Sequence, residues 1–145
     1  MPMTLRDVTP DDIRMSTDVE PLIRTLRPGL SAEAFAAFAK EAHGQGLVFT
    51  AAYDEQDRCL AVATHRVLAT SRGRIFFVDD LVTHPERRSG GIGARLLTAL
   101  KERARAAGCV RVELDSGVTN QAAHRFYHSQ RLVISALHFS AEVTS

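Results

Sequence analysis

A glycine-rich loop at the head of an amphipathic helix is the feature that most limits what this sequence can fold into. The loop reads Arg88-Ser89-Gly90-Gly91-Ile92-Gly93-Ala94 and stands between a β-prone run and apolar residues at helical spacing. The first N–H groups of a helix have no partner inside the helix, and the helix dipole is positive there. Glycines at such a point let an anion approach the backbone. The loop therefore predicts a cradle for a diphosphate; the alternative is a loop whose glycines serve turn geometry alone.

Two common phosphate-binding motifs do not fit the loop. A P-loop is excluded because no Gly-Lys-Ser or Gly-Lys-Thr follows the glycines. A dinucleotide-binding fingerprint could begin with Gly91 and Gly93, and Glu113 stands where an acidic ribose ligand is expected. Leu96, however, occupies the place of the third glycine, and the residues ahead of the loop leave no room for the second half of such a sheet.

The hydrophobic pattern predicts a mixed α/β chain with an antiparallel meander at its centre. Strands are expected at Thr4–Val8, Leu47–Tyr53, Cys59–Ala69, Arg74–Thr83 and Val110–Leu114, with one or two more between Leu132 and Val143. Helices are expected from Thr9 and Pro10 to Leu26 with an interruption at Pro21, from Ser31 to Gly44, from Ile92 to Ala107 and from Asn120 to Ser129.

Composition narrows the classes of partner. The 145 residues carry 18 Lys and Arg against 17 Asp and Glu, a net charge of +1, which gives no electrostatic reason to bind nucleic acid or an anionic membrane. No apolar run approaches the ~20 residues that span a bilayer. Cys59 and Cys109 are too few for a disulfide framework. With no linker and no apolar signal region, we expect one domain, 1–145, in the cytoplasm.

Two stretches of the sequence carry a family resemblance. The first runs from Asp79-Asp80-Leu81-Val82-Thr83 through the glycine loop to Leu97, and the second is Asn120-Gln121-Ala122-Ala123-His124-Arg125-Phe126-Tyr127. The first resembles the central motif of the GCN5-related N-acetyltransferases (the GNAT family), and the second resembles that family's Asn…Phe-Tyr segment. The resemblance covers nearly the whole chain in the right order.

The resemblance implies a fold and a co-substrate. The fold would be mixed α+β: a twisted, mostly antiparallel sheet with splayed central strands, flanked by about four helices in a single GNAT domain. Acetyl-CoA would enter the splay, and no metal would be needed. The implied contacts of the cofactor are Leu81, Val82 and Thr83 for the pantetheine arm; Arg88, Ser89, Gly90, Gly91, Ile92, Gly93 and Ala94 for the pyrophosphate; and Asn120 and Tyr127.

The implied activity is that of an acyl-CoA-dependent N-acyltransferase, which moves acetyl to the primary amine of a small molecule or peptide by direct attack in a ternary complex. Tyr127 matches the family tyrosine that protonates the leaving thiolate, with a core tyrosine as the alternative. A backbone N–H near Val82 would stabilise the oxyanion. Asp80 is the leading general base; strand alternation would point Asp79 to the opposite face.

Other candidates remain open at this stage. Glu113 and Asp115 are further acids for the base, and the pair His124 and His128 is set aside as a metal site because no third ligand is evident. By the same resemblance, some of the residues between Leu26 and Phe38 should face the acceptor. The departure Gln130-Arg131-Leu132, which lacks the glycine that usually closes the family's last helix, casts doubt on the final strands.

The sequence says less about the identity of the acceptor amine. An aminoalkylphosphonate-like amine is one candidate, for which Arg24, Arg27 or Arg66 could supply positive charge. The runner-up function is a non-catalytic acyl-CoA-binding domain, and a dinucleotide-binding fragment is third. Homodimers are frequent in the family, so a homodimer is one expected assembly.

Overall fold

The computed structural model describes residues 2–143, except for the side chains of Arg88 and Ser89. The chain forms two compact units, Met1–Glu113 and Leu114–Ser145. The first contains almost all of the sheet and three of the four α-helices that are described, and the second contains the fourth α-helix and the C-terminal segment. The mixed α+β class expected from the hydrophobic pattern is confirmed.

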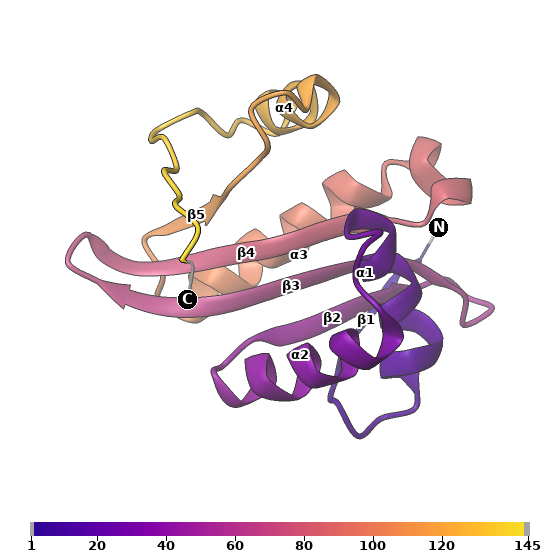
Figure 1. The fold of residues 1–145 in the computed structure, drawn as a ribbon. Helices are drawn as coiled ribbons and strands as arrows, with labels where there is room; N and C mark the ends of the chain where they lie inside the picture. The colour runs from indigo at the N-terminus through magenta and orange to yellow at the C-terminus, as the bar shows by residue number, and fades with distance from the viewer. Residues whose placement is uncertain (1, 144–145) are drawn as a thin grey trace. The chain divides into compact units, whose positions relative to one another are not determined.

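The sheet has five strands in the order β1-β2-β3-β4-β5 (Figure 1). Their bounds are β1 Thr4–Val8, β2 Val48–Tyr53, β3 Cys59–Thr70, β4 Gly73–Thr83 and β5 Arg111–Leu114. The first four strands pair antiparallel with their neighbours in sequence, so the meander is confirmed. Short polar turns join β2 to β3 and β3 to β4, as suits antiparallel neighbours, whereas residues 9–47 stand between β1 and β2.

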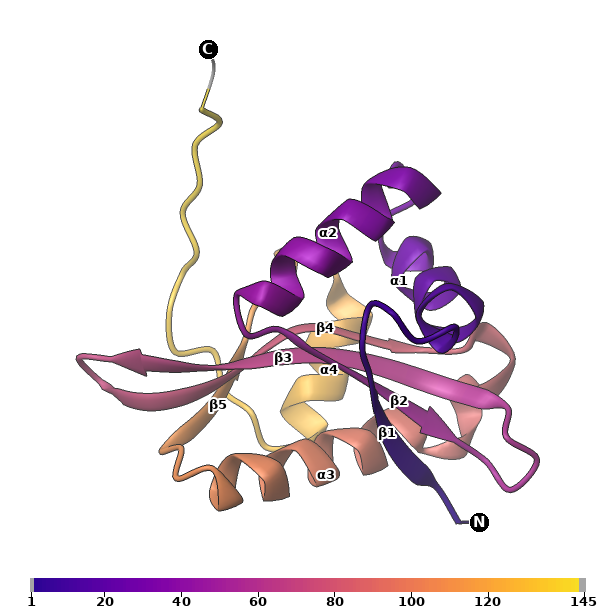
Figure 2. The ribbon, with the colours of Figure 1, turned by 90° about the horizontal axis from the view of Figure 1, so that it is seen from below.

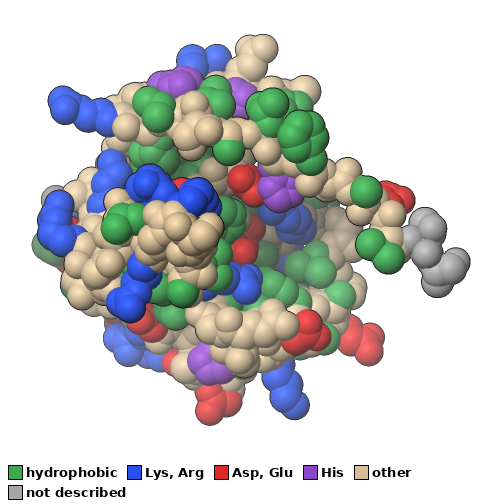
Figure 3. Space-filling model, turned by 90° about the vertical axis from the view of Figure 1, so that its left-hand side faces the viewer, with side chains coloured by type: hydrophobic (Ala, Val, Ile, Leu, Met, Phe, Trp, Pro, Cys, Tyr) green, Lys and Arg blue, Asp and Glu red, His purple; other side chains and the backbone are tan. Residues whose placement is uncertain are grey.

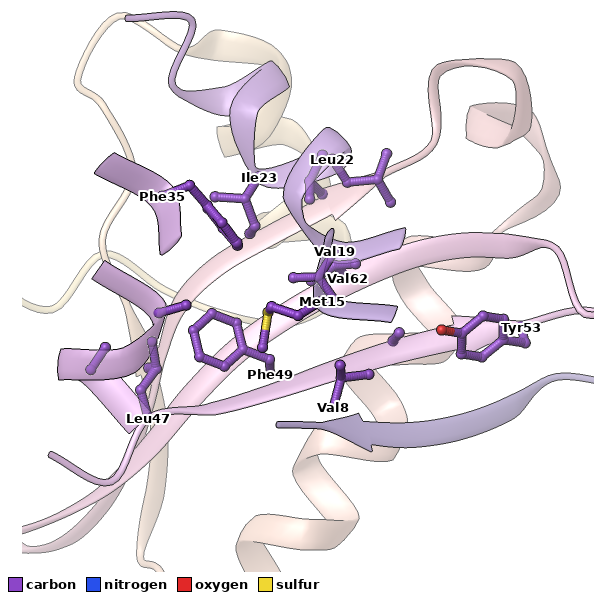
Figure 4. Packing of buried hydrophobic residues seen from close by; sticks show 14 residues of the cluster. Val8, Met15, Val19, Leu22, Ile23, Phe35, Leu47, Phe49, Tyr53 and Val62 are labelled. Atoms are coloured by element: carbon purple, nitrogen blue, oxygen red, sulfur yellow. The ribbon is translucent and has the colours of Figure 1, made fainter. Parts of the chain in front are cut away.

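Helices lie on both faces of this sheet (Figure 2). The π-helical turn η1 (Met15–Val19), α1 (Glu20–Leu26) and α2 (Ala32–Gly44) cover one face, and α3 (Ile92–Ala106) covers the other. The first face holds the main apolar core, in which side chains of η1, α1 and α2 meet those of the strands (Figure 4). Its buried members include Met15, Val19, Leu22, Ile23, Phe35, Leu47, Phe49 and Val62.

A polar network that is buried at Thr50 and His65 ties α3 to the sheet on the opposite face. The Thr50 hydroxyl donates to Asp7 Oδ1 at 2.8 Å and lies 2.8 Å from Nε2 of His65. Arg103 of α3 donates from Nη1 to both Asp7 and Thr50, at 2.8 and 3.1 Å. Because the Thr50 oxygen accepts from Arg103 and gives its own proton to Asp7, Nε2 of His65 must be the donor in their bond. His65 also stacks on Phe76, with ring centroids 4.7 Å apart.

The first helix begins later than the sequence predicted. Thr9 and Pro10 form a turn instead of a helix start: the Asp12 N–H donates to the Thr9 carbonyl, and the Asp12 carboxylate accepts from the Arg14 N–H. Aspartate side chains that bond to their own backbone favour turns over helices, which explains the difference. The expected interruption at Pro21 is confirmed, since Pro21 stands in the first turn of α1 after η1.

The second unit contains α4 (Gln121–Ser129) and an extended C-terminal segment. Asn120 caps α4 by accepting from the Ala123 N–H at 3.1 Å. The strands predicted between Leu132 and Val143 are not formed: residues 132–143 have no regular structure. Apolar side chains here stay exposed: Val133, Ile134, Leu137, Phe139 and Val143. A β-prone sequence becomes a strand only where a partner strand pairs with it.

The end of α4 is closed by a residue with an uncommon backbone. Arg131 adopts the left-handed conformation at φ 67°. Helices that end with this conformation usually have glycine at that position. The N–H of Leu132 donates to the Tyr127 carbonyl, and the N–H of Arg131 donates to the His128 carbonyl. These two bonds form a Schellman motif. Arg131 therefore takes the place of the missing glycine at the end of α4.

On the face drawn in Figure 3, charges of both signs are mixed. Among the described helices, none has the length and apolar character needed to cross a membrane.

Candidate functional site

The glycine loop opens α3 as predicted. Residues Pro85–Gly90 form a short 3₁₀ turn, η2, and Gly91 is the N-cap residue of α3 with φ 69°. A side chain is disfavoured at this φ, yet a Cβ on Gly91 would meet no described atom within 4 Å. Gly91 therefore brings no capping side chain to the first N–H groups of a 15-residue helix, and the space beside it is open. This start of α3 fits a diphosphate. The side chains of Arg88 and Ser89 lie outside the described part.

The end of β4 that leads into this loop has an open side. Leu81, Val82 and Thr83 pair with Ala63, Val62 and Ala61 of β3. On the other side β5 is only four residues long, and its start lies at the opposite end of β4, where the Val110 N–H donates to the Arg74 carbonyl at 2.8 Å. Within the described residues, no strand therefore borders Leu81–Thr83 on the side away from β3.

A β-bulge in β4 sets the direction of its two aspartates. Thr64 pairs with Asp80 and His65 pairs with Val78, so Asp79 is an extra residue in β4. Asp80 accepts from Thr64, and Asp79 pairs with Arg66, two residues further along β3. Since residues two apart on a strand share a face, both carboxylates lie on one face. The expectation that alternation would separate Asp79 and Asp80 was wrong, because a bulge breaks alternation.

Each of these carboxylates already has a cationic partner. Arg66 donates from Nε and Nη2 to the two oxygens of Asp79, at 3.2 and 3.0 Å. Arg27, which follows α1, donates from Nη2 to Asp80 Oδ1 at 3.3 Å. Thr64 Oγ1 donates to the other oxygen of Asp80 at 2.7 Å. The sequence analysis did not identify Thr64 as a partner of Asp80. That partnership follows from the pairing of Thr64 with Asp80, which can be known only once the register of β3 and β4 is known.

Tyr127 and Asn120 belong to the second unit. Tyr127 lies on α4 edge-on to Phe126, with ring centroids 5.3 Å apart. Burial raises the pKa of the Tyr127 phenol above its ordinary value of 10. The phenol therefore keeps its proton at neutral pH. The capping role of Asn120, which the sequence offered beside a cofactor contact, is confirmed.

The remaining acids and histidines have other partners. Glu113 pairs with Arg72 at 2.7 Å and with Arg111 at 3.2 Å, and these bonds hold its pKa below the ordinary value. Asp115 pairs with His138 at 2.9 Å. Nε2 of His124 lies 2.8 Å from the Gly117 carbonyl. Across residues 2–143, no group of three His, Cys, Asp or Glu side chains could hold a metal ion.

Cys59, at the start of β3, has a half-buried thiol. Burial raises the pKa of its thiol to about 12, and the nearby Asp18 adds to this shift. The nucleophilic thiolate is therefore scarce at neutral pH.

Comparison with known proteins agrees with this architecture. Residues 16–131 match the model of the acetyltransferase (GNAT) family. The uncharacterized N-acetyltransferase YhdJ of Bacillus subtilis (strain 168) is 34% identical over 117 residues, which are 80% of this chain and 73% of YhdJ.

Two solved structures illustrate the similarity of fold. Aminoglycoside N-acetyltransferase AAC(6')-Iy in complex with CoA has a TM-score of 0.82 at 15% identity, over 99% of this chain and 96% of that one. Glucosamine-6-phosphate N-acetyltransferase from Arabidopsis thaliana has a TM-score of 0.72 at 19% identity, over 99% and 100% of the chains. At such identities these structures support the fold alone. The family match and the Bacillus relative go further: the chain belongs to the GNAT family and is an acyl-CoA-dependent N-acetyltransferase.

Proposed function

We propose that this enzyme moves the acetyl group of acetyl-CoA to the primary amine of a small molecule or peptide by direct attack within a ternary complex. The observation that carries the proposal is the start of α3, where Gly91 lies in the left-handed region beside open space and caps the helix without a side chain. An uncapped helix start of this kind favours a phosphate.

The proposed contacts with acetyl-CoA are made mainly by backbone. N–H groups between Arg88 and Ala94 would receive the pyrophosphate, and the open side of Leu81–Thr83 would bond to the pantetheine amides, as an added strand does. The free strand edge supports this assignment. Further contacts from Asn120 and Tyr127 rest on the family resemblance.

The proposed chemistry needs one bond made and one broken. The amine nitrogen bonds to the acetyl carbonyl carbon, and the bond from that carbon to sulfur breaks. A backbone N–H near Val82 would donate to the oxyanion. Asp80 would hold the acceptor ammonium and accept its proton, directly or through water, and Tyr127 would protonate the leaving sulfur. The pairing of Asp80 with an exposed, exchangeable cation and the raised pKa of Tyr127, which keeps the phenol protonated, support these roles.

The acceptor has to be argued from this chain, since the two solved neighbours are named for different amines, an aminoglycoside and glucosamine 6-phosphate. The three arginines that could meet a phosphonate are not equivalent. Arg24 is held by the Leu30 carbonyl at 2.8 Å and by Glu20 at 3.1 Å, and Arg66 is held by both oxygens of Asp79. Arg27 has 61% of its side chain exposed, so it is the arginine that an acceptor would meet.

The test of the proposed function is a pair of glycine substitutions. Gly91 and Gly46 both have positive φ and open surroundings, but Gly46 lies at the end of α2. Gly91→Ala and Gly46→Ala should each destabilise the fold by about 1 kcal/mol. Only Gly91→Ala should weaken acetyl-CoA binding, by about tenfold or more, because its Cβ would occupy the space of the phosphates.

Acetyl-CoA affinity is measured by calorimetry, and transfer is measured as release of CoA thiol that depends on an added amine. Equal acetyl-CoA affinity in the two variants would exclude the start of α3 as the phosphate site. Acetyl-CoA binding with no amine-dependent thiol release over a broad panel of amines and peptides would contradict the proposed acceptor reaction.

A further inference from the structure

Asp80 has one fixed partner and one exchangeable partner. Its Oδ2 accepts from Thr64, whose side chain is buried within the sheet, at 2.7 Å. Its Oδ1 pairs with Nη2 of Arg27 at 3.3 Å, and the Arg27 side chain is 61% exposed while that of Asp80 is 11% exposed. A pair of this length and exposure is weak in water, so a competing ion can separate it.

An acceptor ammonium that binds Asp80 must compete with Arg27 for the same oxygen. If the acceptor carries only positive charge, the guanidinium of Arg27 loses its carboxylate and lies next to a second cation. If the acceptor also carries an anion, that anion can bind Arg27 while the ammonium binds Asp80, and each charge keeps an opposite partner.

The surrounding charges favour the second case. Asp79 is neutralised by a two-bond contact with Arg66, so it offers little free negative charge to a second ammonium. The four side chains Asp79, Asp80, Arg27 and Arg66 carry two charges of each sign. A polycationic amine would need a surplus of negative charge, which these four residues do not supply.

We propose that Arg27 is a specificity-determining residue and that the acceptor is a short zwitterionic amine, with a carboxylate, phosphate or phosphonate close to its primary amine. The proposal rests on the proposed function for the role of Asp80. Charged hydrogen bonds are about 2.7–2.9 Å long, and Arg27 and Asp80 are 3.3 Å apart. The acceptor's nitrogen and anionic oxygen should therefore be about 3–5 Å apart, the span of a spacer of about one to three carbons.

The experiment compares matched amines on three forms of the enzyme. The amines are propylamine, β-alanine, 2-aminoethylphosphonate, 6-aminohexanoate and the polycation spermidine. The enzymes are the wild type, Arg27→Gln, and Arg105→Gln as a control, since Arg105 is an exposed arginine on α3 that also pairs with a carboxylate. Arg27→Lys tests whether charge alone suffices. Readouts are kcat/KM for acetyl transfer and, independently of turnover, the amine's Kd by calorimetry.

The wild type should prefer β-alanine or 2-aminoethylphosphonate to propylamine by about tenfold or more, with 6-aminohexanoate and spermidine poorer. Arg27→Gln should abolish that preference and raise kcat/KM for propylamine, because its ammonium no longer competes with Arg27 for Asp80. Arg105→Gln should behave as the wild type, and Arg27→Lys should restore part of the preference. The better of the two short acids identifies the anion.

Two results would overturn the proposal: no preference for a short zwitterion in the wild type, or an equal loss for every amine in Arg27→Gln, which would make Arg27 structural. Failure of the proposed function is a separate result. If no amine is acetylated, the Kd values still decide, because a zwitterion that binds through Arg27 supports the specificity claim and one that binds equally well to Arg27→Gln refutes it.

Discussion

The chain's two tyrosines, Tyr53 and Tyr127, both hold their protons firmly, but for different reasons. Tyr53 is buried and donates to the Asp18 carboxylate at 2.6 Å, and burial together with that bond raises its pKa. For Tyr127 the raised pKa comes from burial alone. The Tyr53 hydroxyl donates its hydrogen bond to Asp18. Among the described residues, the Tyr127 hydroxyl makes no such bond, so its proton is not committed to a structural partner.

We predict that Tyr127→Phe lowers kcat by about tenfold to a hundredfold, because the leaving thiolate loses its proton donor. The KM for acetyl-CoA should change little. Tyr53→Phe is the matched control: it should reduce stability by about 1 kcal/mol through loss of the Asp18 bond, with kcat unchanged. Steady-state kinetics and urea unfolding measure both effects, and an unchanged rate in Tyr127→Phe would remove this residue from the mechanism.

The two aspartates of β4 show where residue-level reasoning from the sequence stops. The sequence located Asp79 and Asp80 ahead of the glycine loop, but their directions depend on strand register, which a bulge resets. Thr64 and Arg66, which hold the two carboxylates, come from another strand. No local pattern in β4 contains that information.

At the level of elements, the end of α4 offers a test of backbone strain. We predict that Arg131→Gly stabilises α4 by about 0.5–1 kcal/mol, because glycine adopts the left-handed conformation without the cost that a side chain brings. Gln130→Gly, one residue earlier at φ −91°, should instead destabilise it. Hydrogen exchange of the α4 amides reports both changes, and slower exchange only in Arg131→Gly is the expected result. Faster exchange in that variant would mean that the arginine side chain itself stabilises the turn.

The sequence predicted best the elements whose partners are close along the chain. The meander and α3 lie within one or two residues of the expected bounds, since short turns and an unbroken apolar stripe specify them locally. The helix start at Pro10 and the strands after Leu132 were wrong for two reasons. Side-chain bonds of Asp12 made a turn, and a β-prone segment without a neighbouring strand stayed irregular.

At the scale of the whole molecule, His65 makes stability depend on pH. Burial, together with the positive charge of Arg103, lowers the pKa of His65 from 6.5 to about 4, while Asp7 opposes that shift. Below pH 6.5 the unfolded chain takes up a proton on this histidine that the folded chain refuses, so folding stability falls as pH drops from 6.5 towards 4. The loss should approach about 3 kcal/mol at pH 4, because each pKa unit corresponds to ~1.4 kcal/mol.

The measurement is urea unfolding between pH 7.5 and 4 for the wild type and two variants. His65→Gln should be less stable than the wild type at pH 7.5, because it disturbs the network with Thr50, but its stability should fall less steeply with acid. His43→Gln, which replaces an exposed histidine on α2, should follow the wild-type curve. Parallel curves for wild type and His65→Gln would show that His65 does not carry the pH dependence.

The extra residue at position 79 interrupts the β3–β4 ladder, yet the pairs on either side of it, Val78 with His65 and Asp80 with Thr64, remain in step. Removing residue 79 would therefore join two segments that are already aligned, with Asp80 still opposite Thr64. The gain or loss of one codon at this position therefore adds or removes the Asp79 carboxylate, while the pairing of β3 with β4 stays the same. Under the proposed function, that change alters the charges near the acceptor and leaves the strand pairing intact.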